Sequence, residues 1–168
     1  MVKRGWRRRP RSPKKLVAGG LTVLLERVAG AAAYYSDEAY EQAGVQLTDA
    51  AGALACDIVA KVRRPLEDEV AAMREGSVFI GHAETCEQDS LISAMHQRKI
   101  TILAMERIPR ISRAQSMDAL SSQSNIAGYR AVIEAASHFG RFIPLMMTSA
   151  GSAKPARVVV LGAGVAGW

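Results

Sequence analysis

The sequence is poor in cysteine and in aromatic residues, and it has no long apolar run. Its two cysteines, Cys56 and Cys86, are thirty residues apart, which matches neither a disulfide framework nor a zinc pattern. We therefore expect reduced thiols, as in cytosolic proteins. No stretch approaches the roughly 18–20 apolar residues of a membrane span. The chain is not expected to cross a bilayer, although it could dock on a partner that does.

The three histidines, His82, His96 and His138, lack the spacing of metal ligands. We expect structural or surface roles for them and predict no metal site.

Acidic residues are missing from the first fifteen positions, which hold eight of the 22 Lys and Arg residues. The remainder has 14 basic and 16 acidic residues. Such a tract can bind nucleic acid or anionic membrane, or it can be a solvated, disordered end. Because the rest of the chain shows no basic face or aromatic platform, we expect a disordered tract over residues 1–15 and no nucleic-acid partner.

Short apolar runs alternate with amphipathic segments along the first two thirds of the chain. Strands are predicted over residues 21–25, 56–62, 77–80 and 100–105, and helices over 13–19, 36–44, 48–54, 65–76 and 87–99. This alternation predicts an α/β fold, a Rossmann-like parallel sheet covered on both faces by helices in right-handed crossovers.

The pattern changes after Met105. Residues 106–115 have no clean period, and we expect a loop at the carboxyl end of a strand, where open parallel sheets bind ligands. A long helix is predicted over 116–138, then a linker rich in small residues over 148–155. The apolar run 157–161 is predicted to be the first strand of a second, truncated Rossmann domain.

These segments predict three regions of the chain. Residues 1–15 form the basic tract, residues 16–145 form an N-terminal Rossmann-like domain ending in the long helix, and residues 146–168 form the linker and the start of a dinucleotide-binding domain.

Polar side chains gather where the long helix is expected to begin. The block from Arg110 to Val132 holds arginines, amides, hydroxyls and the acid Asp118. Fixed polar groups beside a helix start suit an anionic or polyhydroxylated ligand, and a nicotinamide nucleotide has both characters. The alternative is a capped helix behind a solvated loop, with Ser116 or Asp118 as the cap.

The run 157–161 leads into Gly162-x-Gly164-x-x-Gly167, here called the glycine fingerprint. This pattern begins a dinucleotide-binding βαβ unit. The helix that would receive the pyrophosphate, and the acid about 20 residues further on that binds the ribose, are not in this sequence. We therefore expect the isolated chain to bind NADH no more tightly than the millimolar range.

Five further segments accompany the 110–132 block in a resemblance to a known family. From about residue 14 to residue 167 the chain resembles the alpha subunits of proton-translocating NAD(P) transhydrogenases, of the alanine dehydrogenase/transhydrogenase family. The other segments that carry the likeness are Arg27–Ala33, Ser36–Tyr40, Lys61–Pro65, Met146–Gly151 and Val160–Gly167.

The resemblance implies hydride transfer between NADH and NADP, coupled to proton translocation in the whole complex. It implies NAD(H) as the cofactor of this subunit, with NADP(H) bound by a partner subunit. It further implies a homodimer that is cytoplasmic and peripheral to the inner membrane, held there by membrane-embedded transhydrogenase subunits.

The resemblance also implies roles for single residues. Gln115 would position the nicotinamide against the incoming NADP ring. Arg110 and Asp118 would hold the loop and the ribose or carboxamide, and Ser121 would bond the carboxamide. Gly162, Gly164 and Gly167 would admit the pyrophosphate.

The chain departs from the family at both ends. The family opens with a β-strand, whereas residues 1–13 keep only an Arg-Arg pair and Pro13 from that text. We expect the first strand to be lost, at the expense of a central pairing partner for the sheet. The chain is expected to be a truncated product, active only with a complementary chain, or a non-catalytic remnant that pairs with an intact subunit.

Alanine dehydrogenase is the second enzyme that the family allows. Its members bind pyruvate through an Arg, a Lys just before Glu-Pro, and a His. Here the matching text is Lys61-Val-Arg-Arg-Pro65, so that lysine is replaced, and His82 falls near the histidine. We rank this activity below transhydrogenase.

Overall fold

The computed structural model describes residues 11–84 and 89–167. The chain divides by its contacts into two units, residues 1–108 and residues 109–168. Each unit is described by itself, and the predicted domain boundary at residue 145 stays a prediction.

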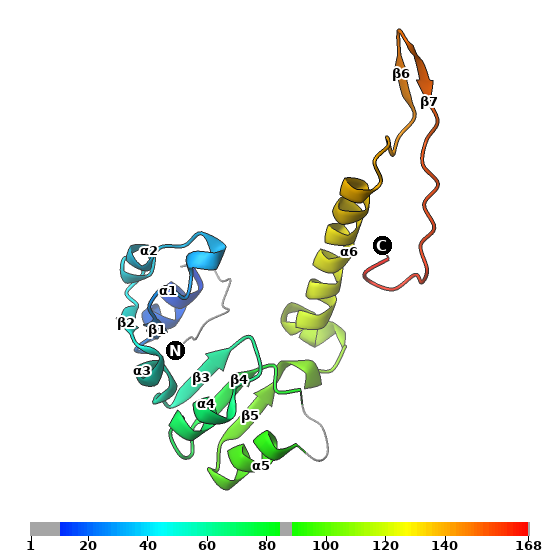
Figure 1. The fold of residues 1–168 in the computed structure, drawn as a ribbon. Helices are drawn as coiled ribbons and strands as arrows, with labels where there is room; N and C mark the ends of the chain where they lie inside the picture. The colour runs from blue at the N-terminus through cyan, green and yellow to red at the C-terminus, as the bar shows by residue number, and fades with distance from the viewer. Residues whose placement is uncertain (1–10, 85–88, 168) are drawn as a thin grey trace. The chain divides into compact units, whose positions relative to one another are not determined.

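Helices and short strands alternate along the first unit (Figure 1). The helices are α1 (Arg11–Ala18), α2 (Asp37–Glu41), α3 (Ala50–Leu54), α4 (Glu67–Ala72) and α5 (Ser90–Gln97), with 3₁₀ helices over Ala31–Ala33 and Met105–Arg107. The strands are β1 (Leu24–Glu26), β2 (Gln46–Thr48), β3 (Ile58–Lys61), β4 (Val78–Gly81) and β5 (Thr101–Ala104).

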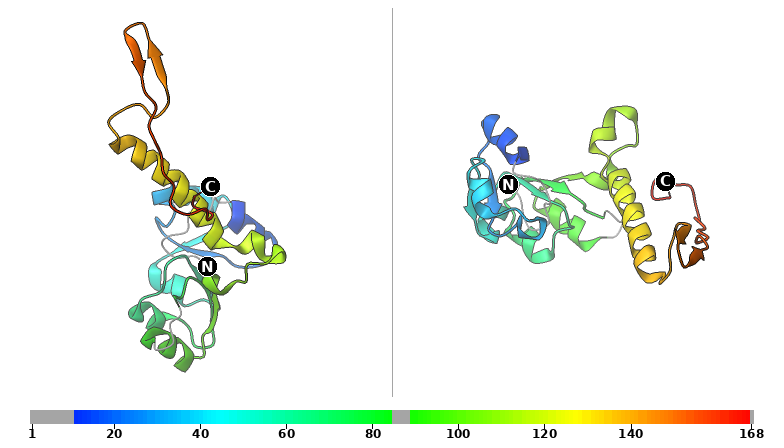
Figure 2. Two further views of the ribbon diagram at one scale, coloured as in Figure 1. Left: turned by 90° about the vertical axis from the view of Figure 1, so that its right-hand side faces the viewer. Right: turned by 90° about the horizontal axis from the view of Figure 1, so that it is seen from above.

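The second unit is built around one long helix. A 3₁₀ helix over Ser112–Met117 leads into α6 (Ala119–His138), and β6 (Met146–Thr148) and β7 (Gly151–Ala153) follow as an antiparallel hairpin. The chain then returns, and its last described residues lie beside α6 (Figure 2).

All strands of the first unit pair in parallel, as the alternation predicted. β1 pairs with β2, and β3, β4 and β5 form a three-stranded sheet in that order. Val59 is opposite Phe79, and Phe79 is opposite Ile102. The predicted α/β fold class, with parallel sheets and helices, is confirmed.

The main core lies on one face of the β3–β4–β5 sheet. Val59 and Phe79 alternate with more exposed residues along their strands and pack with Val70, Met73 and Met95 from the α4 and α5 region. Burying each of these side chains contributes about 1.5–3 kcal/mol. The expected cover on both faces is not seen, because two successive right-handed crossovers in one direction place α4 and α5 on the same side.

A second, smaller core joins β1 and β2. Val23, Leu25 and Val45 are buried around Tyr40 of α2. The rings of Tyr40 and Tyr35 meet edge to face with their centroids 6.4 Å apart, a favoured aromatic geometry.

Lys61 and Glu69 form a buried ion pair between the end of β3 and helix α4. The Glu69 carboxylate also accepts the backbone N–H of Leu66 at 2.9 Å, which satisfies a free donor at the helix start. One buried acid therefore links the sheet to the first turn of α4.

The structure departs from the predicted elements in several places. Residues 11–15, expected in a disordered tract, are helical in α1, while residues 1–10, with the expected loss of a first strand, lie outside the described residues. Cys86 lies outside them too. β2 was not predicted, because three residues of mixed polarity give too short a pattern.

The predicted linker over 148–155 is wrong in part, because residues 146–153 form the β6–β7 hairpin. Thr148 closes the turn: its hydroxyl donates to the Gly151 carbonyl at 3.1 Å and accepts the Ala150 N–H at 3.2 Å. The predicted strand over 157–161 is not formed. Its valines are exposed, and no strand of the described residues pairs with them.

Candidate functional site at the start of α6 and the glycine turn

Asp118 begins α6 and holds its first turn. Its carboxylate accepts the Ser121 N–H at 2.9 Å and the Ser121 hydroxyl at 2.6 Å. Its own N–H donates to the Gln115 carbonyl at 3.2 Å, which joins the helix to the preceding 3₁₀ turn. Of the two caps that the sequence offered, Asp118 is therefore the one that the structure uses.

The surroundings of Asp118 favour its charged form. The hydrogen bond from the Ser121 hydroxyl lowers the pKa of Asp118 most, followed by the Ser121 N–H, and the Arg110 charge adds to the effect. Asp118 is consequently a carboxylate at neutral pH, with its oxygens turned toward the helix start.

The Ser121 hydroxyl has one proton, and it is given to Asp118. Toward a further ligand this oxygen can only accept, so it suits an N–H donor such as the amide nitrogen of a carboxamide. Gln115 and Arg110 are exposed just before the helix. The structure thus brings Asp118 and Ser121 into contact, with Arg110 near enough to act on the Asp118 charge.

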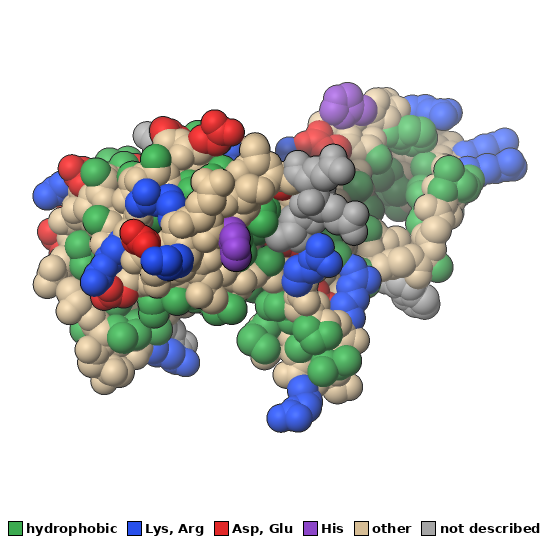
Figure 3. Space-filling view, turned by 90° about the horizontal axis from the view of Figure 1, so that it is seen from below, with side chains coloured by type: hydrophobic (Ala, Val, Ile, Leu, Met, Phe, Trp, Pro, Cys, Tyr) green, Lys and Arg blue, Asp and Glu red, His purple; other side chains and the backbone are tan. Residues whose placement is uncertain are grey.

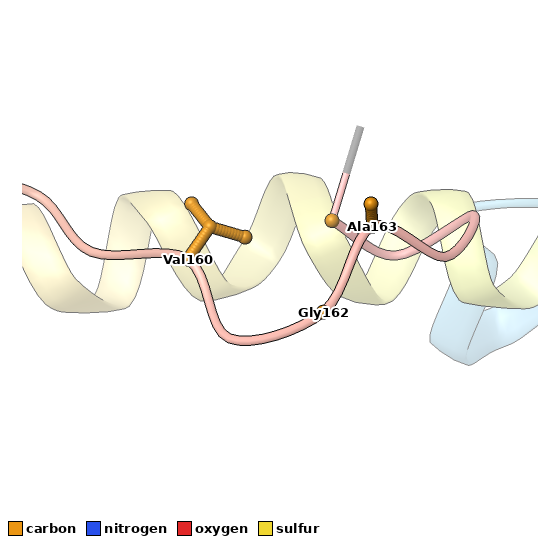
Figure 4. Close-up of a pocket in the computed structure, with 4 residues that line it drawn as sticks. Val160, Gly162 and Ala163 are labelled. Atoms are coloured by element: carbon orange, nitrogen blue, oxygen red, sulfur yellow. The ribbon is translucent and has the colours of Figure 1, made fainter.

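The three glycines of the fingerprint have three different environments. Gly162 has a φ of 103°, a conformation that side chains rarely adopt. A Cβ at Gly167 would overlap the Gly162 carbonyl oxygen, whereas a Cβ at Gly164 would meet nothing within 4 Å. Figure 4 shows the turn, where Val160, Gly162, Ala163 and Gly167 line an open hollow of about 380 Å³.

The turn lies against the middle of α6. The backbone of Ala166 approaches Gly128 so closely that a Cβ on Gly128 would lie 3.0 Å from the Ala166 carbonyl carbon. Gly128 is ten residues after Asp118, or about 15 Å along the helix. Sequence reasoning did not single out Gly128, although a glycine inside a helix is a known signal of close packing.

The residues that an alanine dehydrogenase would use are engaged otherwise. Arg64 donates to the Asp89 carboxylate at 2.5 Å and to the Glu84 carbonyl at 3.3 Å. His82 Nδ1 lies 3.7 Å from a Glu106 carboxylate oxygen. The contacts of this edge are those of a packed sheet end, and they add nothing in favour of pyruvate binding.

Metal ligands do not gather in the regions of the chain that the structure describes: no three His, Cys, Asp or Glu side chains there could hold an ion together. Within the same residues, no helix has the length and apolar character of a membrane span. On the face shown in Figure 3, acidic and basic side chains are interspersed with hydrophobic ones.

Two family models match the sequence. The alanine dehydrogenase/PNT N-terminal domain covers residues 8–127, and the alanine dehydrogenase/PNT C-terminal domain covers residues 131–168. The chain belongs to the alanine dehydrogenase/PNT family. The boundary between the two models falls inside α6, so this helix joins the two domains of the family.

Relatives within the alanine dehydrogenase/PNT family include transhydrogenases and alanine dehydrogenases. The first segment of the split NAD(P) transhydrogenase subunit alpha of Rhodospirillum rubrum is 50% identical over 165 residues, and the match covers 94% of this chain and 43% of that relative. Alanine dehydrogenase 2 of Staphylococcus aureus is 32% identical and matches 71% of this chain and 32% of its own length. The chain spans less than half of these relatives.

Solved structures agree with this placement. A transhydrogenase from Sinorhizobium meliloti is 41% identical, with a TM-score of 0.92 over 99% of this chain and 53% of its own. An L-alanine dehydrogenase is 27% identical, with a TM-score of 0.82 over 99% of this chain and 50% of its own. Both comparisons place the transhydrogenase nearer than the alanine dehydrogenase.

Proposed function

We propose that the chain binds NAD(H) as a portion of a transhydrogenase alpha subunit, which transfers hydride between NADH and NADP. In the complete assembly a partner subunit binds NADP(H), and membrane-embedded subunits couple the transfer to proton translocation. The assembly holds this chain at the cytoplasmic side of the inner membrane. The names of the more similar relatives support this proposal.

The geometry of the glycine fingerprint is the observation on which NAD(H) binding rests. In dinucleotide sites the first glycine makes a tight turn, the second lets the pyrophosphate approach the backbone, and the third allows close packing. Gly162 has the positive φ, Gly164 faces open space, and Gly167 packs tightly, in that order. Each glycine has the environment that its place in the pattern requires.

The start of α6 supplies groups for the nicotinamide end. In this proposal Gln115 positions the nicotinamide against the NADP ring, and Ser121 accepts from the carboxamide N–H. Asp118 and Arg110 hold the loop and the ribose. The cofactor carries the hydride, so the protein contributes orientation and the exclusion of wrong geometries.

Saturation-transfer NMR with millimolar NADH tests this proposal, because it detects weak binding. We expect transfer to NADH in the wild-type chain and less to NADPH. Gly164→Ala should abolish the transfer without changing the fold, because its methyl group fills only the space that a phosphate would enter. Gly162→Ala is the contrasting variant, and it should disturb the turn itself, since alanine is strained at a φ of 103°.

Two results would contradict the proposal. If the wild-type chain shows no transfer to millimolar NADH, it does not bind the cofactor in this form. If Gly164→Ala binds NADH as well as the wild type does, the glycine turn is not the pyrophosphate site.

We further propose that the chain pairs with a second copy through α6. Ile126, Tyr129 and Val132 of this helix are all more than half exposed, which leaves apolar surface available for a partner. Sedimentation equilibrium should show dimers of the wild type and monomers of Val132→Glu. A monomeric wild type at high concentration would rule this out.

A further inference from the structure

Gly128 lies near the middle of α6, a helix of 20 residues. A glycine inside a helix costs about 0.5–1 kcal/mol relative to alanine, because it loses more backbone freedom on folding. A helix that keeps a glycine at such a position needs a reason for it, and close approach of another backbone is the usual one.

The close approach is present in the second unit. A Cβ on Gly128 would overlap the carbonyl oxygen of Ala166 and lie 3.0 Å from its carbonyl carbon. Both are backbone atoms, so no side-chain rotation relieves the overlap. Figure 4 shows α6 directly behind this segment.

We propose that Gly128 is a positioning residue for cofactor binding: its bare backbone lets the glycine fingerprint lie against α6. This inference rests on the proposed function, in which the fingerprint receives the pyrophosphate. Gly128 belongs to neither the fingerprint nor the polar cluster at the helix start, and it acts only through Ala166.

The route from Gly128 to the phosphate site is short. Ala166 lies inside the turn that the Gly167 N–H closes on the Gly164 carbonyl at 2.9 Å. A methyl group at position 128 therefore displaces Gly164 and Gly167 together with Ala166. A displacement on the order of 1 Å at a binding group is enough to cause a large loss of function.

The decisive variant is Gly128→Ala, because its two effects have opposite signs. Alanine is the better helix former, so the helicity of α6 should stay equal or rise, as circular dichroism would report. The turn should loosen, so the Gly167 amide should exchange its hydrogen faster. The saturation transfer to millimolar NADH should be lost.

Ser137→Ala is the matched control. Ser137 is nine residues from Gly128, on the opposite side of the helix, and it is exposed. The same gain in helix propensity applies there, without contact with the turn. This variant should keep the wild-type amide exchange at Gly167 and the wild-type NADH signal.

The result that overturns the inference is a Gly128→Ala chain with wild-type exchange at Gly167 and a wild-type NADH signal. Failure of the proposed function is a different result. In that case the wild type itself gives no NADH signal, and the exchange at Gly167 alone decides whether Gly128 positions the turn.

Discussion

Ser121 gives both of its donors to Asp118, the backbone N–H to one carboxylate oxygen at 2.9 Å and the hydroxyl to the other at 2.6 Å. The same contact therefore caps α6 and fixes the direction of the hydroxyl. A group proposed to recognise a carboxamide is oriented by the group that starts its helix, so stability and binding are coupled at this point.

Removing the Ser121 hydroxyl should raise the pKa of Asp118 back toward its ordinary value. The hydroxyl is the largest cause of the lowered pKa, so Ser121→Ala removes most of the effect and leaves the N–H and Arg110 contributions. Ser122→Ala is the matched control, because its hydroxyl donates to the Asp118 backbone carbonyl at 2.9 Å and not to the carboxylate. Carbon-detected NMR titration of Asp118 measures both. Equal pKa values in the two variants would contradict this assignment.

The cap should stabilise α6 in a pH-dependent way. Because folding lowers the pKa of Asp118, the stabilisation is complete at neutral pH and is lost as the pH falls below about 4. Asp118→Ala should therefore lower the Tm at pH 7, and the difference from the wild type should shrink toward pH 2. Thermal unfolding followed by circular dichroism gives both values. A difference that stays constant with pH would show that the charge of Asp118 contributes nothing.

Most of the first unit could be predicted from the sequence, because its strands are continuous apolar runs between helices with clear ends. β3, β4 and β5 lie within the predicted segments, as do α4 and α5. The hairpin over residues 146–153 could not be predicted. Its small residues have the composition of a linker, and only the pairing of Met146 with Ala153 shows otherwise.

The candidate site divides in the same way. The cap by Asp118 follows from residue type and position alone, so the sequence could predict it. The contact between Gly128 and Ala166 joins residues 38 positions apart, and no local pattern encodes such a distance. The run 157–161 shows the converse case, since a strand pattern forms no strand without a partner to pair with.

Lys61 should be among the most sensitive positions of the first unit. Lys61→Met removes one partner of a buried ion pair and leaves the Glu69 carboxylate uncompensated, at a cost of about 3–5 kcal/mol. Replacing both, Lys61→Met with Glu69→Leu, should recover most of that loss. The exposed pair of Arg74 and Asp57 is the control, and Arg74→Met should cost less than about 1 kcal/mol. Urea unfolding measures all of them, and a single Lys61→Met variant of near wild-type stability would contradict the buried pairing.

Val28 should be a site where substitution stabilises the chain. It has a φ of 63°, which is unfavourable for a β-branched residue, and its side chain is 64% exposed, so little packing offsets the strain. Its N–H donates to both Asp37 carboxylate oxygens, at 2.9 and 3.1 Å, which holds the backbone in that conformation. Asparagine tolerates this region and keeps the N–H, so Val28→Asn should raise the free energy of unfolding by about 1 kcal/mol.

The control for that variant is Val62→Asn, at an exposed valine of the same unit that lacks a positive φ. It makes the same change of side chain without relieving backbone strain, so it should be neutral or slightly destabilising. Urea unfolding of the wild type and both variants separates the two cases. If Val28→Asn and Val62→Asn shift the midpoint equally, the strain at Val28 does not contribute to stability, and the hydrogen bonds from Asp37 compensate for it fully.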